Sequence, residues 1–175
     1  IYFTSGGSEA NTLALNNRRH SMSSKFEHHS VVSDWAKISV TQDGFINTHK
    51  LNKMFSEWWE IPFDIMSCMY VNNEIGTIQP IKDIANIAHS KNMVFHTDAV
   101  QAVGHIQVDV KDLNCDMLSA SAHKFGGPKG IGFLYIKNGV ELKPLINGGL
   151  QEFSKRGGTE NVLGIIGMAA ALEDA

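Results

Sequence analysis

The sequence predicts a single α/β domain in which a mainly parallel sheet is covered by helices on both faces. Strand-like and helix-like segments alternate along the 175 residues, as expected of successive βαβ units. The strand-like segments are apolar throughout and do not alternate in polarity, which is typical of strands buried on both faces. No repeat, low-complexity tract or linker divides the chain, so residues 1–175 are expected to form one unit.

The composition narrows the class of protein. The chain is 43% hydrophobic and 19% charged, as in ordinary globular domains. Its net charge is −3 without a Lys/Arg cluster, so we expect no nucleic-acid partner. The weakly polar run 162–172 is too short to cross a bilayer, so no membrane association is expected. Cys68 and Cys115 lie in apolar runs without metal-ligand or disulfide spacing, which favours the reducing cytoplasm.

The first predicted elements are a strand end, a glycine turn and a helix. Residues 1–4 look like the end of a strand and lack an initiator Met, so we expect a fragment. Residues 5–9 (SGGSE) form the turn, and residues 10–19 carry good helix formers. Free N–H groups, the helix dipole and the Ser8 hydroxyl would suit a phosphate there. An ordinary N-cap would give the same pattern.

Two adjacent histidines follow a short polar segment. His28 and His29 lie in residues 26–32, interpreted as a strand, so they would point to opposite faces and at most one would face a given pocket. No HExxH or comparable spacing accompanies them, and metal ligation is therefore poorly supported.

The middle of the chain predicts a turn, two helices and two strands. The turn is at residues 41–44, and the first helix spans residues 51–60 with an apolar stripe. A continuous apolar strand at 63–71 then leads into Asn72 and Asn73, a pair most often found in turns. The apolar stripe of the first helix consists of Leu51, Met54, Phe55 and Trp58. The second helix carries Ile81, Ile84, Ile87 and Ala88 and ends near Lys91–Asn92. A buried strand at residues 94–98 follows it.

Polar groups stand at the ends of two further predicted strands, at residues 94–98 and 117–122. Asp98 ends the strand 94–98, where it is either a helix cap or a functional carboxylate with a buried cationic partner. Lys124 follows a strand at residues 117–122, just before an irregular Gly/Pro loop. Partial burial there would favour the neutral amine that a Schiff base requires, whereas the alternative is a solvated loop lysine.

The end of the chain adds one strand, one loop and one helix. The strand is predicted at residues 131–136 and the helix at residues 162–173. The glycine-rich loop 148–161 between them carries basic residues and could be a flexible linker. Ser8, Asn73, Asp98 and Lys124 all follow predicted strands, and in open α/β sheets that edge binds ligands.

Together these segments resemble the cofactor domain of the cysteine desulfurases, which are pyridoxal-phosphate enzymes of fold type I. Six blocks carry the resemblance, in order: residues 4–9 (TSGGSE), 27–29 (EHH), 70–76 (YVNNEIG), 96–101 (HTDAVQ), 119–132 (SASAHKFGGPKGIG) and 156–161 (RGGTEN).

The resemblance implies roles around the ring of pyridoxal 5'-phosphate. Lys124 would hold the cofactor as a Schiff base, and Asp98 would pair with the ring nitrogen and keep it protonated. His28 would stack on the ring and move protons. Asn73 and Gln101 would hydrogen-bond the phenolic oxygen of the ring or its surroundings.

It also implies how the phosphate is held. Gly7, Ser8, Ser121 and His123 would bind the phosphate within one subunit. Thr159 would reach the phosphate of a neighbouring subunit, so the resemblance implies a homodimer in which both chains complete each site.

The activity implied is that of a cysteine desulfurase. L-cysteine would give L-alanine, with sulfur left on an enzyme cysteine as a persulfide for iron–sulfur or other sulfur-cofactor assembly, and a sulfur-acceptor or scaffold protein is a possible partner. In the family that cysteine lies in a smaller C-terminal domain, which we do not find here, and neither Cys68 nor Cys115 matches its position. Residues 17–42 also look shorter than in relatives. The alternatives are a cofactor-binding dimerisation module without turnover and a selenocysteine lyase-like β-eliminating enzyme.

Overall fold

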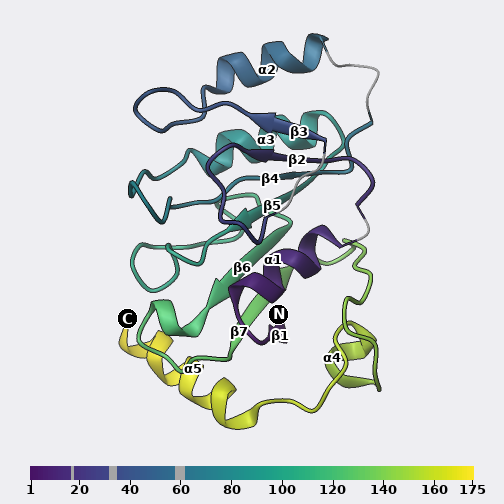
Figure 1. The fold of residues 1–175 in the computed structure, drawn as a ribbon, viewed down its shortest axis with the longest axis vertical. Helices are drawn as coiled ribbons and strands as arrows, with labels where there is room; N and C mark the ends of the chain where they lie inside the picture. Colours follow the sequence, from purple (N-terminus) through teal and green to yellow (C-terminus); the bar gives the residue numbers. More distant parts are fainter. Residues whose placement is uncertain (17, 32–34, 58–61) are drawn as a thin grey trace.

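A computed structural model describes residues 1–16, 18–31, 35–57 and 62–175 (Figure 1). In this part of the chain seven strands form one sheet in the order β1-β7-β6-β5-β4-β2-β3. Neighbouring strands from β3 to β6 pair in parallel, whereas β7 is antiparallel to both β6 and β1. The prediction of a mainly parallel sheet is confirmed. The strands are β1 (Tyr2–Thr4), β2 (Ser21–Ser24), β3 (Ala36–Ile38), β4 (Ile65–Ser67), β5 (Val94–Asp98), β6 (Met117–Ser121) and β7 (Gly132–Ile136).

Helices cover both faces of this sheet. Helix α1 crosses in front of β6 and β7 in Figure 1, and α3 packs on β5 with α2 against it. Successive residues of β6 show the two faces: Met117 belongs to the apolar cluster that contains Leu13 of α1, and Leu118 to the cluster that contains Ile84 of α3. The helices are α1 (Gly7–Leu15), α2 (Thr48–Glu57), α3 (Ile81–Ser90), α4 (Gln151–Ser154) and α5 (Val162–Asp174), with a 3₁₀ turn at Ala122–Lys124.

The predicted strand at residues 26–32 is wrong. Its described part, residues 26–31, is a loop that carries His28 and His29, and the strand lies earlier, at β2. All four residues of β2 are buried, although three are serines. Hydrogen bonds offset the cost of burying hydroxyls here, since Ser23 Oγ accepts from Lys37 Nζ at 2.9 Å. A run of serines carries no hydrophobic signal, and the strand was therefore missed.

Other bounds differ from those predicted. The strand predicted at 63–71 is reduced to β4, because the chain leaves the sheet toward the turn that Asn72 caps. The helix predicted at 51–60 begins at Thr48 and is described as far as Glu57, and Trp58 lies outside the described residues. The helix predicted at 10–19 occupies Gly7–Leu15, and β3 was not predicted.

The glycine-rich loop 148–161 is not a free linker. It contains α4, in which Glu152, Phe153 and Ser154 have left-handed backbone angles. Arg156 donates to both carboxylate oxygens of Glu9 on α1, at 2.8 and 3.1 Å. This two-pronged ion pair ties the loop to the main body of the fold.

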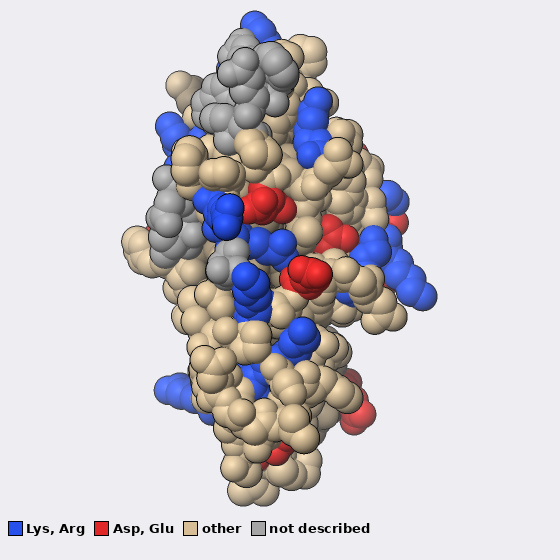
Figure 2. Space-filling view, turned by 90° about the vertical axis from the view of Figure 1, so that its right-hand side faces the viewer, with Lys and Arg blue, Asp and Glu red and all other residues tan. Residues whose placement is uncertain are grey.

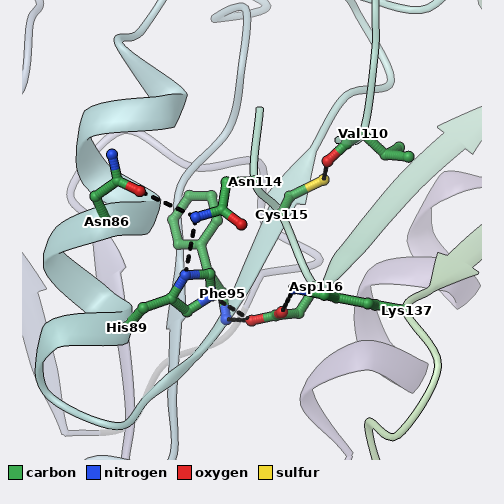
Figure 3. A network of polar contacts seen from close by, with 8 residues as sticks. All are labelled: Asn86, His89, Phe95, Val110, Asn114, Cys115, Asp116 and Lys137. Carbon is green, nitrogen blue, oxygen red and sulfur yellow. Dashed lines mark hydrogen bonds and ion pairs between the residues drawn. The ribbon is translucent and has the colours of Figure 1, made fainter. Parts of the chain in front are cut away.

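At the edge where the parallel strands begin, Asp116 joins three elements (Figure 3). Its Oδ2 accepts from the backbone N–H of Phe95 on β5 at 2.8 Å and from Nε2 of His89 on α3 at 2.7 Å. Nδ1 of His89 lies 3.3 Å from the donating amide of Asn114, so the ring hydrogen belongs on Nε2. Lys137, after β7, lies 3.4 Å from Oδ1.

We expect Asp116→Ala to lower the free energy of unfolding by roughly 2–4 kcal/mol, because it leaves the buried N–H of Phe95 without an acceptor and unpairs His89. Lys137→Ala should cost less than about 1 kcal/mol, since that side chain is half exposed. Urea unfolding of both variants measures this difference. Equal losses of unfolding free energy in the two variants would show that the stabilisation comes from the exposed ion pair between Asp116 and Lys137.

His96 is enclosed in the sheet between two serines. Nδ1 lies 2.8 Å from Ser67 Oγ on β4, and Nε2 lies 2.9 Å from Ser119 Oγ on β6. The residue is fully buried, and this burial lowers its pKa from 6.5 to about 3. The imidazole is therefore neutral in the folded protein at any pH above that value.

The unfolded chain binds a proton at His96 below about pH 6.5, whereas the folded chain does so only near pH 3. Stability from this residue is complete above pH 6.5 and falls as the pH drops toward 3, by on the order of 4 kcal/mol in all. His96→Gln, which cannot titrate, should be less stable than wild type at pH 7, by a margin that shrinks in acid. A margin that stays constant in urea unfolding across this range would contradict the assignment.

Candidate active site

A cavity of about 280 Å³ opens at the edge of the sheet where the parallel strands end. It is lined by nine of the ten residues that the sequence singled out: Gly7, Ser8, His28, Asn73, Asp98, Gln101, Ser121, His123 and Lys124. The tenth, Thr159, lines a separate hollow of about 160 Å³ with Glu152 and Arg156. The fold thus gathers side chains that are up to 117 positions apart in the sequence.

Parallel pairing explains this convergence. β5 and β6 run side by side with Asp98 opposite Ser119, so both strands end at the same edge. The 3₁₀ turn that follows β6 then carries His123 and Lys124 to the cavity. The N-terminus of α1, which begins after a two-residue turn that follows β1, lies at the same place.

Asp98 is the buried anion of the cavity. Its carboxylate accepts from Asn11 Nδ2 at 2.6 Å and from the N–H of Val100 at 3.0 Å. Burial raises its pKa above the ordinary value, and this rise is opposed by the two hydrogen bonds and by the charge of Lys124. The hydrogen bonds hold the carboxylate in one orientation, and the remaining lone pairs are available to a cationic donor.

Lys124 is exposed, not partly buried as the sequence suggested. It stands at the end of a single turn, and the glycines that follow provide no side chains to cover it. Its carbonyl oxygen lies 2.8 Å from His105 Nε2, which fixes the backbone of the turn. The amine is therefore at the open side of the cavity, and the Asp98 carboxylate is at the closed side.

The first turn of α1 forms a third, anion-binding part of the cavity. The N-cap residue is Gly6, which has no side chain to accept from the first N–H groups of the helix. A Cβ on Gly7 would lie 2.6 Å from Val100 Cγ2, so a larger residue at this position would force the Val100 side chain to shift. Ser8 lies beside these N–H groups, and Ser121 Oγ lies 3.0 Å from His123 Nδ1. Hydroxyls, N–H groups and the helix dipole converge here.

Sequence reasoning missed four further lining residues: Asn11, Ser30, Met69 and Val100. Asn11 could have been found, because it is a polar residue on the buried face of α1 among Ala10, Leu13 and Ala14. Its Oδ1 is buried and has no hydrogen-bond partner within the described chain. A native protein seldom buries such an acceptor without a ligand or water to satisfy it.

Glu27 forms a second buried carboxyl group beside the site. The residue as a whole is partly exposed, but its Oε1 accepts from the Met69 N–H at 2.9 Å and from the Ser24 hydroxyl, while Oε2 is buried without a partner in the described residues. Burial raises its pKa to about 8, and the charge of Asp98 adds to the rise. Glu27 therefore holds a proton at neutral pH, a role that its place in the motif EHH did not predict.

Neither cysteine is accessible. Cys68 and Cys115 are both buried, and burial raises the pKa of Cys68 well above its ordinary value and that of Cys115 to about 12. Reactive thiols need access and a stabilised thiolate. Among the described residues no group of three or more His, Cys, Asp or Glu side chains could hold a metal ion. The helices of the described chain are all too short or too polar to cross a membrane.

Comparison with known sequences gives a consistent family. The sequence pattern of class-V aminotransferases matches residues 1–174. The cysteine desulfurase IscS of Clostridium botulinum is 45% identical over 191 residues, which cover 99% of this chain and 47% of the relative. IscS of Methanosarcina thermophila is 44% identical, with 99% and 46% covered. This chain therefore spans about half the length of the curated relatives it matches. The 191 aligned positions exceed its 175 residues, so the Clostridium enzyme has extra residues inside the matched region.

Solved structures agree in fold. A NifS-like protein from Rickettsia africae superposes with a TM-score of 0.89 at 33% identity, covering 98% of this chain and 49% of that protein. SspA in complex with cysteine gives a TM-score of 0.86 at 38% identity, covering 98% and 54%. With a sequence match over nearly its whole length and the same arrangement of strands and helices, the chain belongs to the class-V aminotransferase family.

Proposed function

We propose that this chain is the cofactor-binding part of a pyridoxal-phosphate-dependent cysteine desulfurase. One observation carries the proposal: a single cavity has an amine, Lys124, at its open side, a buried carboxylate, Asp98, at its closed side and a helix N-terminus at a third. Pyridoxal 5'-phosphate has an aldehyde, a ring nitrogen and a phosphate, which are the groups that these three features bind.

Three observations support the fit of this cofactor. The buried Oδ1 of Asn11 lacks a partner in the described residues. The first turn of α1 has a glycine cap without a capping side chain, which suits a phosphate. Asp98, Lys124 and His28 all line the same cavity of about 280 Å³, so these groups lie near enough to surround one small ligand.

The bound cofactor would supply an electron sink for the bonds around the α-carbon of an amino acid. The residues of this chain bind and orient it. Asp98 would hold a proton on the ring nitrogen, Asn73 and Gln101 would hydrogen-bond around the phenolic oxygen, and His28 would stack on the ring and move a proton at the substrate. Gly7, Ser8, Ser121 and His123 would bind the phosphate.

L-cysteine is the proposed substrate, and L-alanine the product. The sequence relatives are named cysteine desulfurases, and one structural relative is a complex with cysteine. Because Cys68 and Cys115 are buried with raised pKa values, we propose that neither accepts the sulfur. The accepting thiol would then belong to another part of the enzyme, and a sulfur-acceptor or scaffold protein for iron–sulfur assembly would take the sulfur onward.

We also propose a homodimer. Thr159 lies outside the cavity that the other nine residues line, so it is available to a neighbouring subunit. Leu150, Phe153 and Leu163, on or beside α4 and α5, are each at least 84% exposed. The side of the molecule that carries α4 faces the viewer in Figure 2, and its lower part shows few charged side chains. Such an apolar surface is typical of an interface.

A second candidate is a cofactor-binding dimerisation module without turnover. The burial of both thiols favours it for residues 1–175 taken alone. Persulfide formed after addition of L-cysteine to the intact protein would support the desulfurase. Cofactor binding without persulfide or alanine would support the module.

Lys124→Ala should abolish the absorbance band of lysine-bound pyridoxal phosphate, because no other amine lines the cavity in the described chain. Lys111→Ala removes an exposed lysine that does not line the cavity and is the matched control. Absorbance spectra after addition of the cofactor measure both. An unchanged band in Lys124→Ala would refute the assignment of the amine.

Glu27→Gln should change how stability depends on pH. The folded wild type keeps the Glu27 proton up to about pH 8, whereas the unfolded chain loses it near 4.5. The stability from this group is complete below pH 4.5 and is lost as the pH rises to 8, by on the order of 3 kcal/mol after allowance for partial exposure. Urea unfolding should show that Glu27→Gln lacks this loss, while Glu173→Gln on the exposed end of α5 retains it.

A further inference from the structure

One line of hydrogen bonds connects the buried carboxylate of the cavity to the loop histidine. Asn11 Nδ2 donates to Asp98 Oδ2 at 2.6 Å and to Ser30 Oγ at 2.9 Å. Ser30 Oγ in turn lies 2.7 Å from His28 Nδ1, and the backbone N–H of Ser30 donates to the same nitrogen at 3.1 Å. Elements far apart in the sequence, namely α1, the 28–30 loop and the end of β5, thus share one polar network.

The direction of each bond in this line is fixed. The amide of Asn11 has two hydrogens, and both are used, one toward Asp98 and one toward Ser30. Rotating the amide by 180° would place its oxygen 2.6 Å from a carboxylate oxygen, which is repulsive. Because the Ser30 N–H donates to His28 Nδ1, that nitrogen is an acceptor, and the Ser30 hydroxyl donates to it as well. The neutral imidazole therefore carries its hydrogen on Nε2.

The remaining polar atom of Asn11 is free. Asn11 is 1% exposed and lines the cavity, and its Oδ1 has no partner in the described residues. Both amide hydrogens of Asn11 are therefore bonded within the protein, and its Oδ1 remains available to a ligand at the wall of the cavity. A residue that only filled space in α1 would not need this arrangement.

We propose that Asn11 is a positioning residue for the ring nitrogen of the cofactor, because it holds the Asp98 carboxylate ionised and directed at that nitrogen. Ser30 connects Asn11 to His28 through hydrogen bonds. The inference rests on the proposed function, since it names what Asn11 does for the same ligand.

The physical reason lies in the surroundings of Asp98. Burial favours the neutral acid, and the groups that oppose this are the N–H of Val100, the amide of Asn11 and the charge of Lys124, while the nearby Glu27 is held neutral by its own burial. Without the Asn11 donor, a protonated Asp98 is favoured more. A protonated carboxyl group cannot form the ion pair that retains a proton on the ring nitrogen.

The test compares two probes on the intact protein. Pyridoxal 5'-phosphate and its 1-deaza analogue differ only in that carbon replaces the ring nitrogen, so the ratio of their dissociation constants reports the strength of the contact at that atom. Wild type should prefer the natural cofactor. Asn11→Leu, which keeps the size but removes both donors, should reduce this preference by roughly fivefold to tenfold, the equivalent of one ordinary hydrogen bond.

Further variants separate positioning from folding. Ser30→Ala should reduce the preference by roughly twofold to threefold and Ser30→Thr should restore it, because threonine keeps the hydroxyl. Asn16→Leu is the matched control: it makes the same change at the residue that directly follows α1, but the Asn16 amide donates to the carbonyl groups of Lys143 and Pro144 away from the cavity. Its preference should equal that of wild type.

The outcomes distinguish the two proposals. If wild type binds neither probe, the proposed function fails. If wild type prefers the natural cofactor and both Asn11→Leu and Ser30→Ala keep the full preference, the proposed function stands and the role of Asn11 is refuted. If Asn11→Leu does not fold, the Ser30→Ala and Ser30→Thr pair decides the question, since Ser30 is only half-buried and lies on a loop.

Discussion

The candidate site depends on the burial of one carboxylate at the end of a parallel strand. Asp98 is 3% exposed, and removing a charge from water is costly unless donors and opposite charges replace the solvent. The fold supplies these from different directions: an amide from α1, a backbone N–H from the turn after β5, and a cationic group from the turn after β6. The buried Asp98 carboxylate therefore requires α1 and the turns after β5 and β6 to lie close to it.

Much of this arrangement could be predicted because it follows from simple rules. β5 and β6 are mainly apolar, and Asp98 at the end of β5 shares an edge with Lys124, which follows β6, once the strands are parallel. The family resemblance then grouped His28 and Gln101 with them, and all four line one cavity. A functional residue that stands at the end of a buried strand can therefore be placed from the sequence alone, because the parallel strands all end at the same edge of the sheet.

The rest could not be predicted, because it depends on contacts between distant segments. β2 is made mostly of serines whose burial is offset by partners such as Lys37, and this cannot be seen in a local pattern. Missing that strand put His28 on a strand when it belongs to a loop. The exposure of Lys124 depends on how little of the chain covers its turn. Asn11 has two donors whose partners are 19 and 87 positions away.

The hydrogen bonds and ion pairs of Asp116 affect which changes in chain length the fold tolerates. Asp116 holds β5 at its beginning through the Phe95 N–H, and the pairing of Asp98 with Ser119 aligns the other end. The crossover from residue 99 to residue 115 is thus anchored next to both strands, with Val100, Gln101 and His105 tied to the site at its first part. Insertions or deletions at residues 107–112, beyond these three, would be absorbed by the loop without shifting the register, so chain length can drift there while the chemistry at the opposite edge is left undisturbed.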